Sequence, residues 1–304
     1  MKANLYALAA IALWASLSAL GVSLKHVPPF LLTGIALMVG SVLAWPFVLQ
    51  DRRQWQVAPR LLGLGVFTLF GFHFLLFIAL RIAPAVEVNL VNYLWPLFIV
   101  VLAPLYLPGV ALGRVHVIAA AVGFAGAAIA ILGGHETTSA VGNAVTTAPN
   151  TAPSSSAASP AWGPLLGYAM ALGSAFIWAN YSLQTKRAAL NGTGFPTAAI
   201  GLFGLVSGAL SLLCHWALEP TVSLSAHDWL LMAAMGLGPL GAAFFLWDKA
   251  LKLGDARQIG ILSYLTPLAS TVLLMAVTDR PLSWRIALAA SMIIGAAVVG
   301  TRRA

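Results

Sequence analysis

One long apolar segment of the chain, 85–106, carries side chains that could bind a solute. The residues that share one helical face there, by their i, i+3, i+4, i+7 spacing, are Asn89, Asn92, Tyr93 and Pro96. Trp95 lies beside this face. Two amides and a phenol offer hydrogen bonds without a net charge, and inside hydrocarbon such groups need partners. We therefore expect them to line a protein-walled, water-filled cavity.

Aromatic and hydrogen-bonding residues also lie in the middle of other apolar segments. The further side chains expected to line the same cavity are Trp14, His73, Trp178, Tyr181, Ser182 and Tyr264. The tryptophans among them are too deep to be membrane-interface anchors. His73 could instead form a hydrogen bond to a neighbouring helix. Aromatic walls with a few hydrogen-bonding groups suit an amphipathic organic solute better than an inorganic ion.

Two prolines occupy corresponding places in two of these segments, Pro96 in 85–106 and Pro267 in 256–277. A proline inside a helix lacks a backbone N–H donor and clashes with the preceding turn. Each proline should therefore kink its helix and free a backbone carbonyl, beside Tyr93 in one segment and Tyr264 in the other. We expect these two kinks to take part in gating.

The elements that must position these residues are membrane helices. Only 8% of the 304 residues are charged, against about a quarter in an ordinary soluble domain, and 60% are hydrophobic. This composition excludes a soluble enzyme and a disordered chain, and the single cysteine excludes a disulfide scaffold. A membrane helix needs about 20 apolar residues. The segments that satisfy this are 3–24, 29–49, 59–80, 85–106, 112–133, 162–185, 195–217, 228–248, 256–277 and 283–301.

The chain divides into two parts of five segments each. A stretch rich in Ser, Thr, Ala and Pro, 135–160, predicts a flexible periplasmic linker between a first repeat, 1–134, and a second repeat, 161–304. With the N-terminus placed in the cytoplasm, twelve Lys and Arg residues fall inside and four outside. The positive-inside rule therefore predicts that both termini are cytoplasmic. Because five segments is an odd number, the repeats are inverted relative to each other.

The two parts are also related in sequence. Residues 79–97 align without a gap on 250–268, with seven of 19 positions identical, and both contain the pattern Tyr-Leu-x-Pro-Leu at the same depth. Apolar helices resemble one another by composition, but that does not explain the shared pattern. Inverted repeats are typical of secondary transporters, which bind substrate near the membrane midplane between the repeats. Alternating access by rocking of one repeat against the other is the expected mechanism.

The acidic residues give little support to an ionic site. Glu87 lies one turn into its segment and Asp248 at the inner end of another, so neither is expected to be deep. The sequence is thus compatible with facilitated, gradient-driven movement of the substrate. Proton antiport through Glu87 or His73 is the alternative. The pair Gly204 and Gly208, at the spacing Gly-x-x-x-Gly, predicts close helix packing.

The motifs resemble a known group of transporters. Ten helices in two inverted repeats are similar to the drug/metabolite transporter superfamily with its paired EamA-type domains. The stretches Glu87–Pro96, Ala175–Tyr181 and Leu13-Trp14 resemble the aromatic amino acid exporters of the YddG type. That resemblance implies export of amino acids from cytoplasm to periplasm across the bacterial inner membrane. It also implies that Trp14, Tyr93, Trp95 and Trp178 lie at the substrate cavity.

The function expected from the sequence is therefore amino acid export with broad specificity. The alternative is an exporter of other small metabolites or drugs, with coupling to protons as one form of it. An intramembrane enzyme is not expected, because the chain lacks the zinc-protease and nucleophile motifs. We expect an amino acid substrate and the lipid bilayer as partners, a monomer, and no nucleic acid, cofactor or metal.

Overall fold

The structure is a computed structural model that describes residues 2–137, 163–277 and 284–302. The described residues form helices and no strand. Most of the predicted linker, 138–160, lies outside the described residues. Its first three positions do not belong to a loop, because helix α7 continues to Thr137.

The helices join into ten rods that match the ten predicted segments. The rods made of one helix are α1 (Lys2–Ser23), α4 (Pro59–Ile82), α7 (Arg114–Thr137), α8 (Gly163–Leu190), α9 (Ala199–Leu218) and α14 (Trp284–Arg302). The rods made of several pieces are α2 (Pro29–Ser41) with η1 (Val42–Ala44) and α3 (Trp45–Gln50), α5 (Ala85–Asn92) with α6 (Trp95–Tyr106), α10 (Ala226–Leu237) with η3 (Gly238–Ala242) and α11 (Ala243–Leu253), and α12 (Ala256–Leu262) with α13 (Leu265–Val277). A short turn, η2 (Arg52–Trp55), follows α3. Within the described ranges, seven helices are long and apolar enough to cross a membrane.

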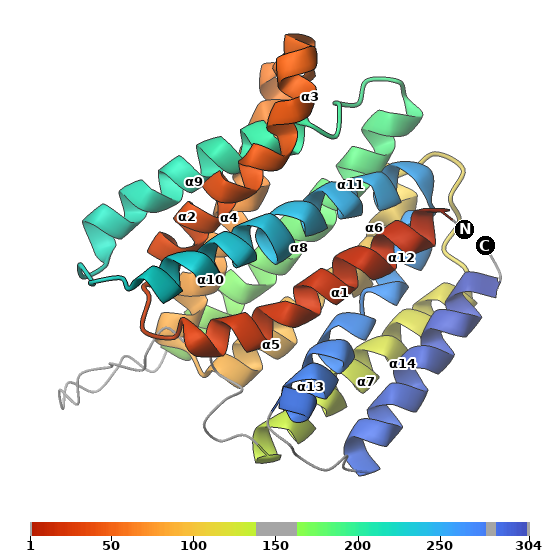
Figure 1. Ribbon diagram of the computed structural model, residues 1–304. Coiled ribbons are helices and arrows are strands. Elements are labelled where there is room, and N and C mark those ends of the chain that lie inside the picture. Colours follow the sequence, from red (N-terminus) through yellow and green to blue (C-terminus); the bar gives the residue numbers. More distant parts are fainter. Residues whose placement is uncertain (1, 138–162, 278–283, 303–304) are drawn as a thin grey trace.

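The first and second sets of five rods pack as two related halves. Contacts join equivalent rods across the halves: α2 with α9, α6 with α12, and α7 with α14. The first rod of each half also contacts the third rod of the other half: α1 contacts α11, and α8 contacts α4. Such an exchange of partners is what a pseudo-two-fold relation between the halves produces. In Figure 1 the α2–α9 and α7–α14 pairs flank the centre, and both ends of the chain lie at the same end of the bundle.

Small residues allow the halves to approach closely between α2 and α9. A Cβ atom added to Gly208 would lie 2.8 Å from the carbonyl oxygen of Gly34, and one added to Gly204 would lie 3.1 Å from that of Leu37. These are backbone atoms that a side chain cannot displace cheaply. The predicted packing role of Gly204 and Gly208 is confirmed.

Two rods are interrupted at equivalent positions. Helix α5 ends at Asn92 and α6 begins at Trp95, while α12 ends at Leu262 and α13 begins at Leu265. The N–H groups of Leu94 and Tyr264 bond to carbonyls three residues earlier, at 3.1 and 3.2 Å, so the turn tightens there. Pro96 then occupies the first turn of α6, where a missing N–H costs nothing.

A third interruption was not expected from the sequence. The segment predicted as one continuous helix, 228–248, contains a wide π-helical turn, Gly238–Ala242, and extends to Leu253. Pro239 in this turn has no N–H to donate. Gly241 packs against Gly40, and a Cβ atom added to Gly241 would lie 2.9 Å from the Cα atom of Gly40. A π-type bulge re-aims the helix that follows it. That helix, α11, carries Trp247 and Asp248 into the centre of the bundle.

Candidate functional site

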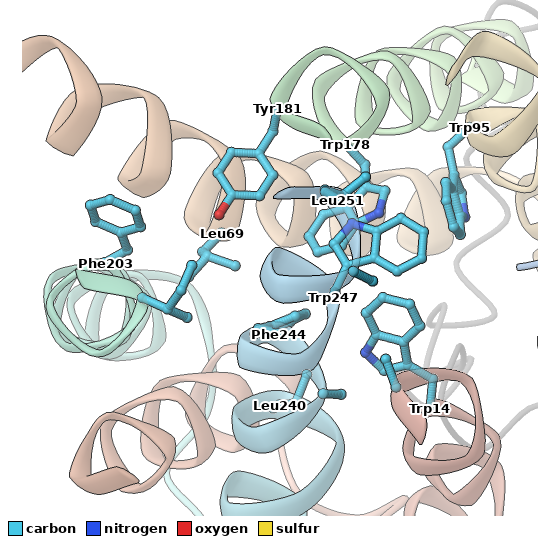
Figure 2. Close-up of a cluster of buried hydrophobic side chains, with 14 of the residues drawn as sticks. Trp14, Leu69, Trp95, Trp178, Tyr181, Phe203, Leu240, Phe244, Trp247 and Leu251 are labelled. Atoms are coloured by element: carbon cyan, nitrogen blue, oxygen red, sulfur yellow. The ribbon is translucent and has the colours of Figure 1, made fainter. Parts of the chain in front are cut away.

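Four tryptophans from four helices meet in the interior of the bundle. This tryptophan cluster consists of Trp14 of α1, Trp95 of α6, Trp178 of α8 and Trp247 of α11 (Figure 2). Ring centroids are 5.2 Å apart for Trp14 and Trp247, 5.5 Å for Trp95 and Trp247, and 5.8 Å for Trp14 and Trp178. No member is more than 9% exposed. Because two members come from each half, the cluster closes the interface between the halves.

Further rings extend the cluster around Trp178. Phe72, Tyr181 and Phe244 lie 5.6, 6.0 and 5.5 Å from its ring centroid. The ring planes are tilted rather than face to face, which suits the quadrupoles of aromatic rings. Tilted, uncharged surfaces of this kind can pack against aliphatic and aromatic side chains alike.

One side-chain hydrogen bond holds the cluster to α8. The indole Nε1 of Trp247 donates to Oγ of Ser182 at 3.2 Å, and that hydroxyl donates to the carbonyl oxygen of Trp178 at 2.9 Å. Ser182 and Trp247 are both buried. The polar atom of Trp247 is thus satisfied without water.

The two candidate asparagines lie toward one side of the cluster, on α5. Asn92 is buried, and its Oδ1 accepts a hydrogen bond of 2.8 Å from Oγ of Ser174 on α8. Asn89 is half-buried one turn earlier. Tyr93 is also half-buried and sits in the break between α5 and α6. These groups border the interface of α5 with α8, next to the interrupted backbone.

Two other candidates lie apart from the tryptophans. His73 reaches the tryptophan cluster only through Phe72. The ring centroids of His73 and Phe72 are 5.1 Å apart, and Phe72 in turn contacts Trp178. Its Nδ1 lies 2.6 Å from the carbonyl oxygen of Leu69 on the same helix, rather than bonding to a neighbouring helix. Tyr264 is fully buried in a separate core cluster, against the ring of Phe124 at 6.4 Å.

The structure thus brings together one part of the predicted set. The members in or bonded to the tryptophan cluster are Trp14, Trp95, Trp178, Tyr181 and Ser182. Asn89, Asn92 and Tyr93 border it, and His73 and Tyr264 do not touch the tryptophans in the contacts described above. The substrate-binding role of all ten predicted residues stays a prediction, as does gating by Pro96 and Pro267.

Sequence reasoning missed Trp247, Phe244 and the depth of Asp248. Asp248 was expected at the end of its segment and shallow, but its side chain is only 1% exposed. Its Oδ2 accepts hydrogen bonds from Nζ of Lys252 at 2.7 Å and from Oγ1 of Thr197 at 2.6 Å. The spacing of Asp248 and Lys252, i and i+4, was the signal that the helix continues beyond 248.

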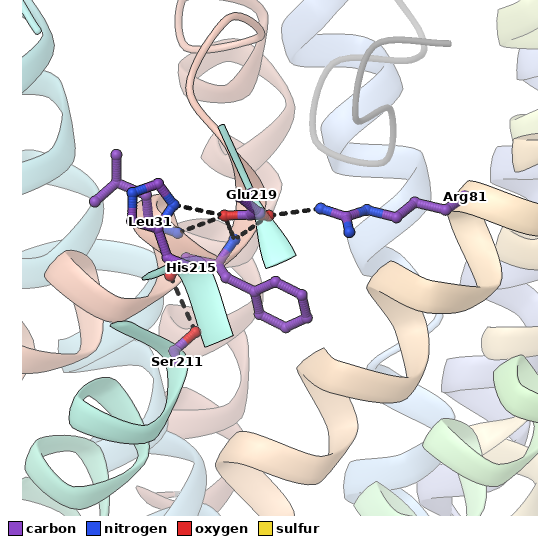
Figure 3. Close-up of polar contacts among 6 residues, drawn as sticks. Leu31, Arg81, Ser211, His215 and Glu219 are labelled. Carbon is purple, nitrogen blue, oxygen red and sulfur yellow. Dashed lines mark hydrogen bonds and ion pairs between the residues drawn. The ribbon is translucent and has the colours of Figure 1, made fainter. Parts of the chain in front are cut away.

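A second buried carboxylate lies at the opposite end of the bundle (Figure 3). Glu219, just past the end of α9, accepts hydrogen bonds of 3.1–3.2 Å from the backbone N–H groups of Phe30 and Leu31 at the start of α2. Nη2 of Arg81, at the end of α4, donates to it at 2.7 Å, and Nδ1 of His215 lies 3.0 Å away. One carboxylate therefore joins three helix ends, and it compensates the positive N-terminal dipole of α2.

A bundle of apolar rods in two related halves, with an aromatic centre built from both, defines a membrane transporter. Across the described residues no group of three His, Cys, Asp or Glu side chains could hold a metal ion. The chain belongs to the EamA-like transporter family, whose model matches residues 1–132 and 165–301. The resemblance inferred from the sequence is confirmed.

Three similar proteins share the name aromatic amino acid exporter YddG. The aromatic amino acid exporter YddG of Ancylobacter novellus is 37% identical over 99% of this chain and 97% of its own length. The protein of that name from Escherichia coli K12 is 27% identical, with 99% and 98% covered, and that from Salmonella typhimurium is 29% identical, with 93% and 91% covered. A solved crystal structure at 35% identity covers 99% of both chains with a TM-score of 0.84.

Proposed function

We propose that this chain exports amino acids, aromatic ones among them, from the cytoplasm to the periplasm. The observation that carries the proposal is the tryptophan cluster, in which uncharged aromatic surfaces from four helices face one another in the interior of a transporter fold. The names of the similar proteins point to the same substrate class. A site of this kind accepts a bulky apolar side chain.

Alternating access would proceed by rocking of the halves about the cluster. Trp14 and Trp95 belong to the first half, and Trp178 and Trp247 to the second, so separating the halves on one side parts these rings. The breaks before Pro96 and Pro267 supply backbone that can bend without breaking helical hydrogen bonds. We assign them the hinge role.

Broad specificity follows from the chemistry of the walls. Rings and a few hydroxyl and amide groups distinguish amino acid side chains weakly, because an apolar pocket discriminates a methylene by only about 1–3 kcal/mol. We therefore propose that aliphatic as well as aromatic amino acids are carried, by facilitated diffusion. Proton coupling through His73 or Glu87 remains the competing mechanism.

The proposal includes an orientation. The repeats 1–134 and 161–304 would lie in the inner membrane as a monomer, with both termini in the cytoplasm and the linker 135–160 in the periplasm. In this orientation the Asp248–Lys252 pair faces the cytoplasmic end, and Glu219 with Arg81 faces the periplasmic end. Cysteine labelling from each side of the membrane tests this arrangement.

An exporter of cationic drugs is the second candidate. Cation binding normally uses a buried unpaired carboxylate, and Asp248 is buried. Its charge is matched by Lys252 at 2.7 Å, so the pair is neutral. This pairing favours a substrate without net charge over a cation.

Flux from proteoliposomes tests the function. The purified chain should release amino acids, with aromatic and aliphatic members of the full set transported, at rates independent of an imposed pH gradient. Cationic dyes serve as the comparison class. Dye flux without amino acid flux would refute the proposal, and amino acid flux that tracks the pH gradient would establish proton antiport instead.

A further inference from the structure

The buried pair Asp248 and Lys252 lies directly beside the tryptophan cluster. Asp248 follows Trp247 on α11, and its side chain is 1% exposed, while that of Lys252 is 19% exposed. The carboxylate is therefore sealed from solvent, whereas the lysine side chain is partly exposed. Burying two charges costs several kcal/mol per ion, which good geometry and further hydrogen bonds must offset.

The hydrogen bonds of the pair are incomplete on the carboxylate. Both donors to Asp248, from Thr197 and Lys252, reach the same oxygen, Oδ2. The other oxygen, Oδ1, is buried and has no hydrogen-bond partner among the described residues. Because a buried carboxylate oxygen is costly when left without a donor, this atom marks a place for a ligand that donates hydrogen bonds.

The ammonium of Lys252 has a donor to spare as well. Of its three N–H groups, one donates to Oδ2 of Asp248 and one to the carbonyl oxygen of Phe195 at 2.7 Å. The ring of Phe195 covers one side of the ammonium, with its centroid 4.4 Å from Nζ. The remaining donor can reach an anionic group arriving from the partly exposed side.

Two buried hydroxyl side chains follow Trp178 along α8, Tyr181 and Thr185. Tyr181 contacts Trp178 at 6.0 Å and lies close enough to Asp248 to interact with its charge. Thr185, one turn further along α8 and beside Tyr181, is 1% exposed. Tyr181 is thus a buried hydroxyl group that contacts Trp178 and also lies within electrostatic range of Asp248.

We propose that Asp248 and Lys252 form a binding site for the zwitterionic head group of an amino acid. Oδ1 of Asp248 accepts hydrogen bonds from the α-ammonium group, and Nζ of Lys252 donates to the α-carboxylate. The substrate side chain then points toward Trp247 and Trp178. This site rests on the proposed function and supplies what the tryptophan cluster lacks, which is recognition of the part shared by all amino acids.

Charge balance explains why the ligand must be a zwitterion. The pair is neutral, and an amino acid adds one positive and one negative group to it. An amine without a carboxylate, or an acid without an amine, would leave a net charge buried, and that is strongly unfavourable. The site therefore rejects amines that lack a carboxylate and acids that lack an amine, while it tolerates many side chains.

The competing explanation is purely structural. The pair also ties α11 to the segment before α9, through Thr197 and the carbonyl oxygen of Phe195. If the pair is only a tether, mutating Asp248 or Lys252 would lower the stability of the protein without changing which head groups bind. Discrimination among head groups therefore separates the two roles.

The test measures competition with L-phenylalanine uptake into proteoliposomes by phenethylamine, which lacks the carboxylate, and by 3-phenylpropionate, which lacks the amine. In the unmodified protein each analogue should bind at least about tenfold more weakly than phenylalanine. Asp248→Asn should weaken phenylalanine binding by at least about tenfold and strengthen 3-phenylpropionate binding, because the acid then balances the charge of Lys252. Lys252→Met should weaken phenylalanine binding and strengthen phenethylamine binding, because the amine then balances the charge of Asp248.

Two control variants complete the experiment. Lys249→Met removes an exposed charge on the same helix that faces Tyr6, and it should keep the discrimination. Thr197→Val removes the tether to Oδ2 but keeps the charges, so the melting temperature should fall while discrimination persists. If Thr197→Val abolishes discrimination as Asp248→Asn does, the pair is a tether and the head-group site is refuted.

The unmodified protein alone can also overturn the inference. Equal binding of phenylalanine and phenethylamine would contradict it even if every variant failed to fold. An absence of phenylalanine uptake in the unmodified protein would instead refute the proposed function. The two failures are therefore distinguishable.

Discussion

The indole nitrogen of Trp247 donates a 3.2 Å hydrogen bond to the hydroxyl of Ser182 in the interior of the bundle. Ser182 donates in turn to the carbonyl oxygen of Trp178, one helical turn earlier. The two tryptophans are therefore tied to the same turn of α8, and the plane of the Trp247 ring is fixed against Trp14 and Trp95. The orientation of the aromatic site depends on one small hydroxyl.

Ser182→Ala should lower both stability and transport. The change leaves the Trp247 N–H buried without an acceptor, which costs about 1–3 kcal/mol. Thermal unfolding in detergent and amino acid flux from proteoliposomes measure the two effects. In a Trp247→Phe background the donor is already absent, so adding Ser182→Ala should cost much less. Equal costs in both backgrounds would show that the hydrogen bond is not responsible.

Trp178→Phe and Trp178→Ala should separate packing from function. Trp178 contacts all three other members of the tryptophan cluster. Truncation to alanine removes a buried ring and should cost about 3–5 kcal/mol, whereas phenylalanine keeps an aromatic surface and most of the stability. We expect transport to fall at least about tenfold with alanine and less with phenylalanine. Trp216→Ala, at an 85% exposed tryptophan, is the control and should leave transport unchanged.

Features that depend on local pattern were predictable from the sequence. The apolar segment 59–80 corresponds to α4, Pro59–Ile82, because hydrocarbon thickness fixes helix length. The shared Tyr-Leu-x-Pro-Leu pattern indicated that Tyr93 and Tyr264 occupy equivalent positions, and both lie in a helix break. Depth along a helix also identified Trp14, Trp95 and Trp178 as interior residues.

Features that depend on how segments meet were not predictable. Ending the eighth segment at 248 placed Trp247 and Asp248 at its edge, whereas the π-helical turn and the extension to Leu253 bring both inside. Tyr264 has the same depth as Tyr93 but faces Phe124, because spacing gives a helix face and not its neighbour. Glu219 lies outside every apolar segment, and its burial requires the ends of α2 and α4.

Glu219→Gln should destabilise the end of the bundle where α2, α4 and α9 meet. The amide keeps the shape but loses the charge that pairs with Arg81 and with the dipole of α2. Because Arg81 is 30% exposed, water compensates it in part, and we expect a loss of roughly 1–3 kcal/mol. Glu87→Gln changes an exposed carboxylate and should leave the melting temperature unchanged. A melting temperature for Glu219→Gln equal to that of Glu87→Gln would contradict the joining role.

Gly208→Ala should separate α2 from α9 and so disturb both halves. The new Cβ would lie 2.7 Å from Cγ of Met38 and 2.8 Å from the carbonyl oxygen of Gly34. Met38 can move, but the carbonyl belongs to the facing helix, so the two helices must shift apart. Overpacking of this kind costs typically about 1–3 kcal/mol.

Gly63→Ala provides the opposite case. Nothing lies within 4 Å of a Cβ at Gly63, which is exposed on α4. Alanine there should stabilise the helix by roughly 0.5–1 kcal/mol, because glycine loses more conformational entropy on folding. The same chemical change is thus expected to act with opposite sign at the two positions. Melting temperatures that rise equally for both variants would mean that helix propensity, rather than the approach of Gly34 to Gly208, sets the effect.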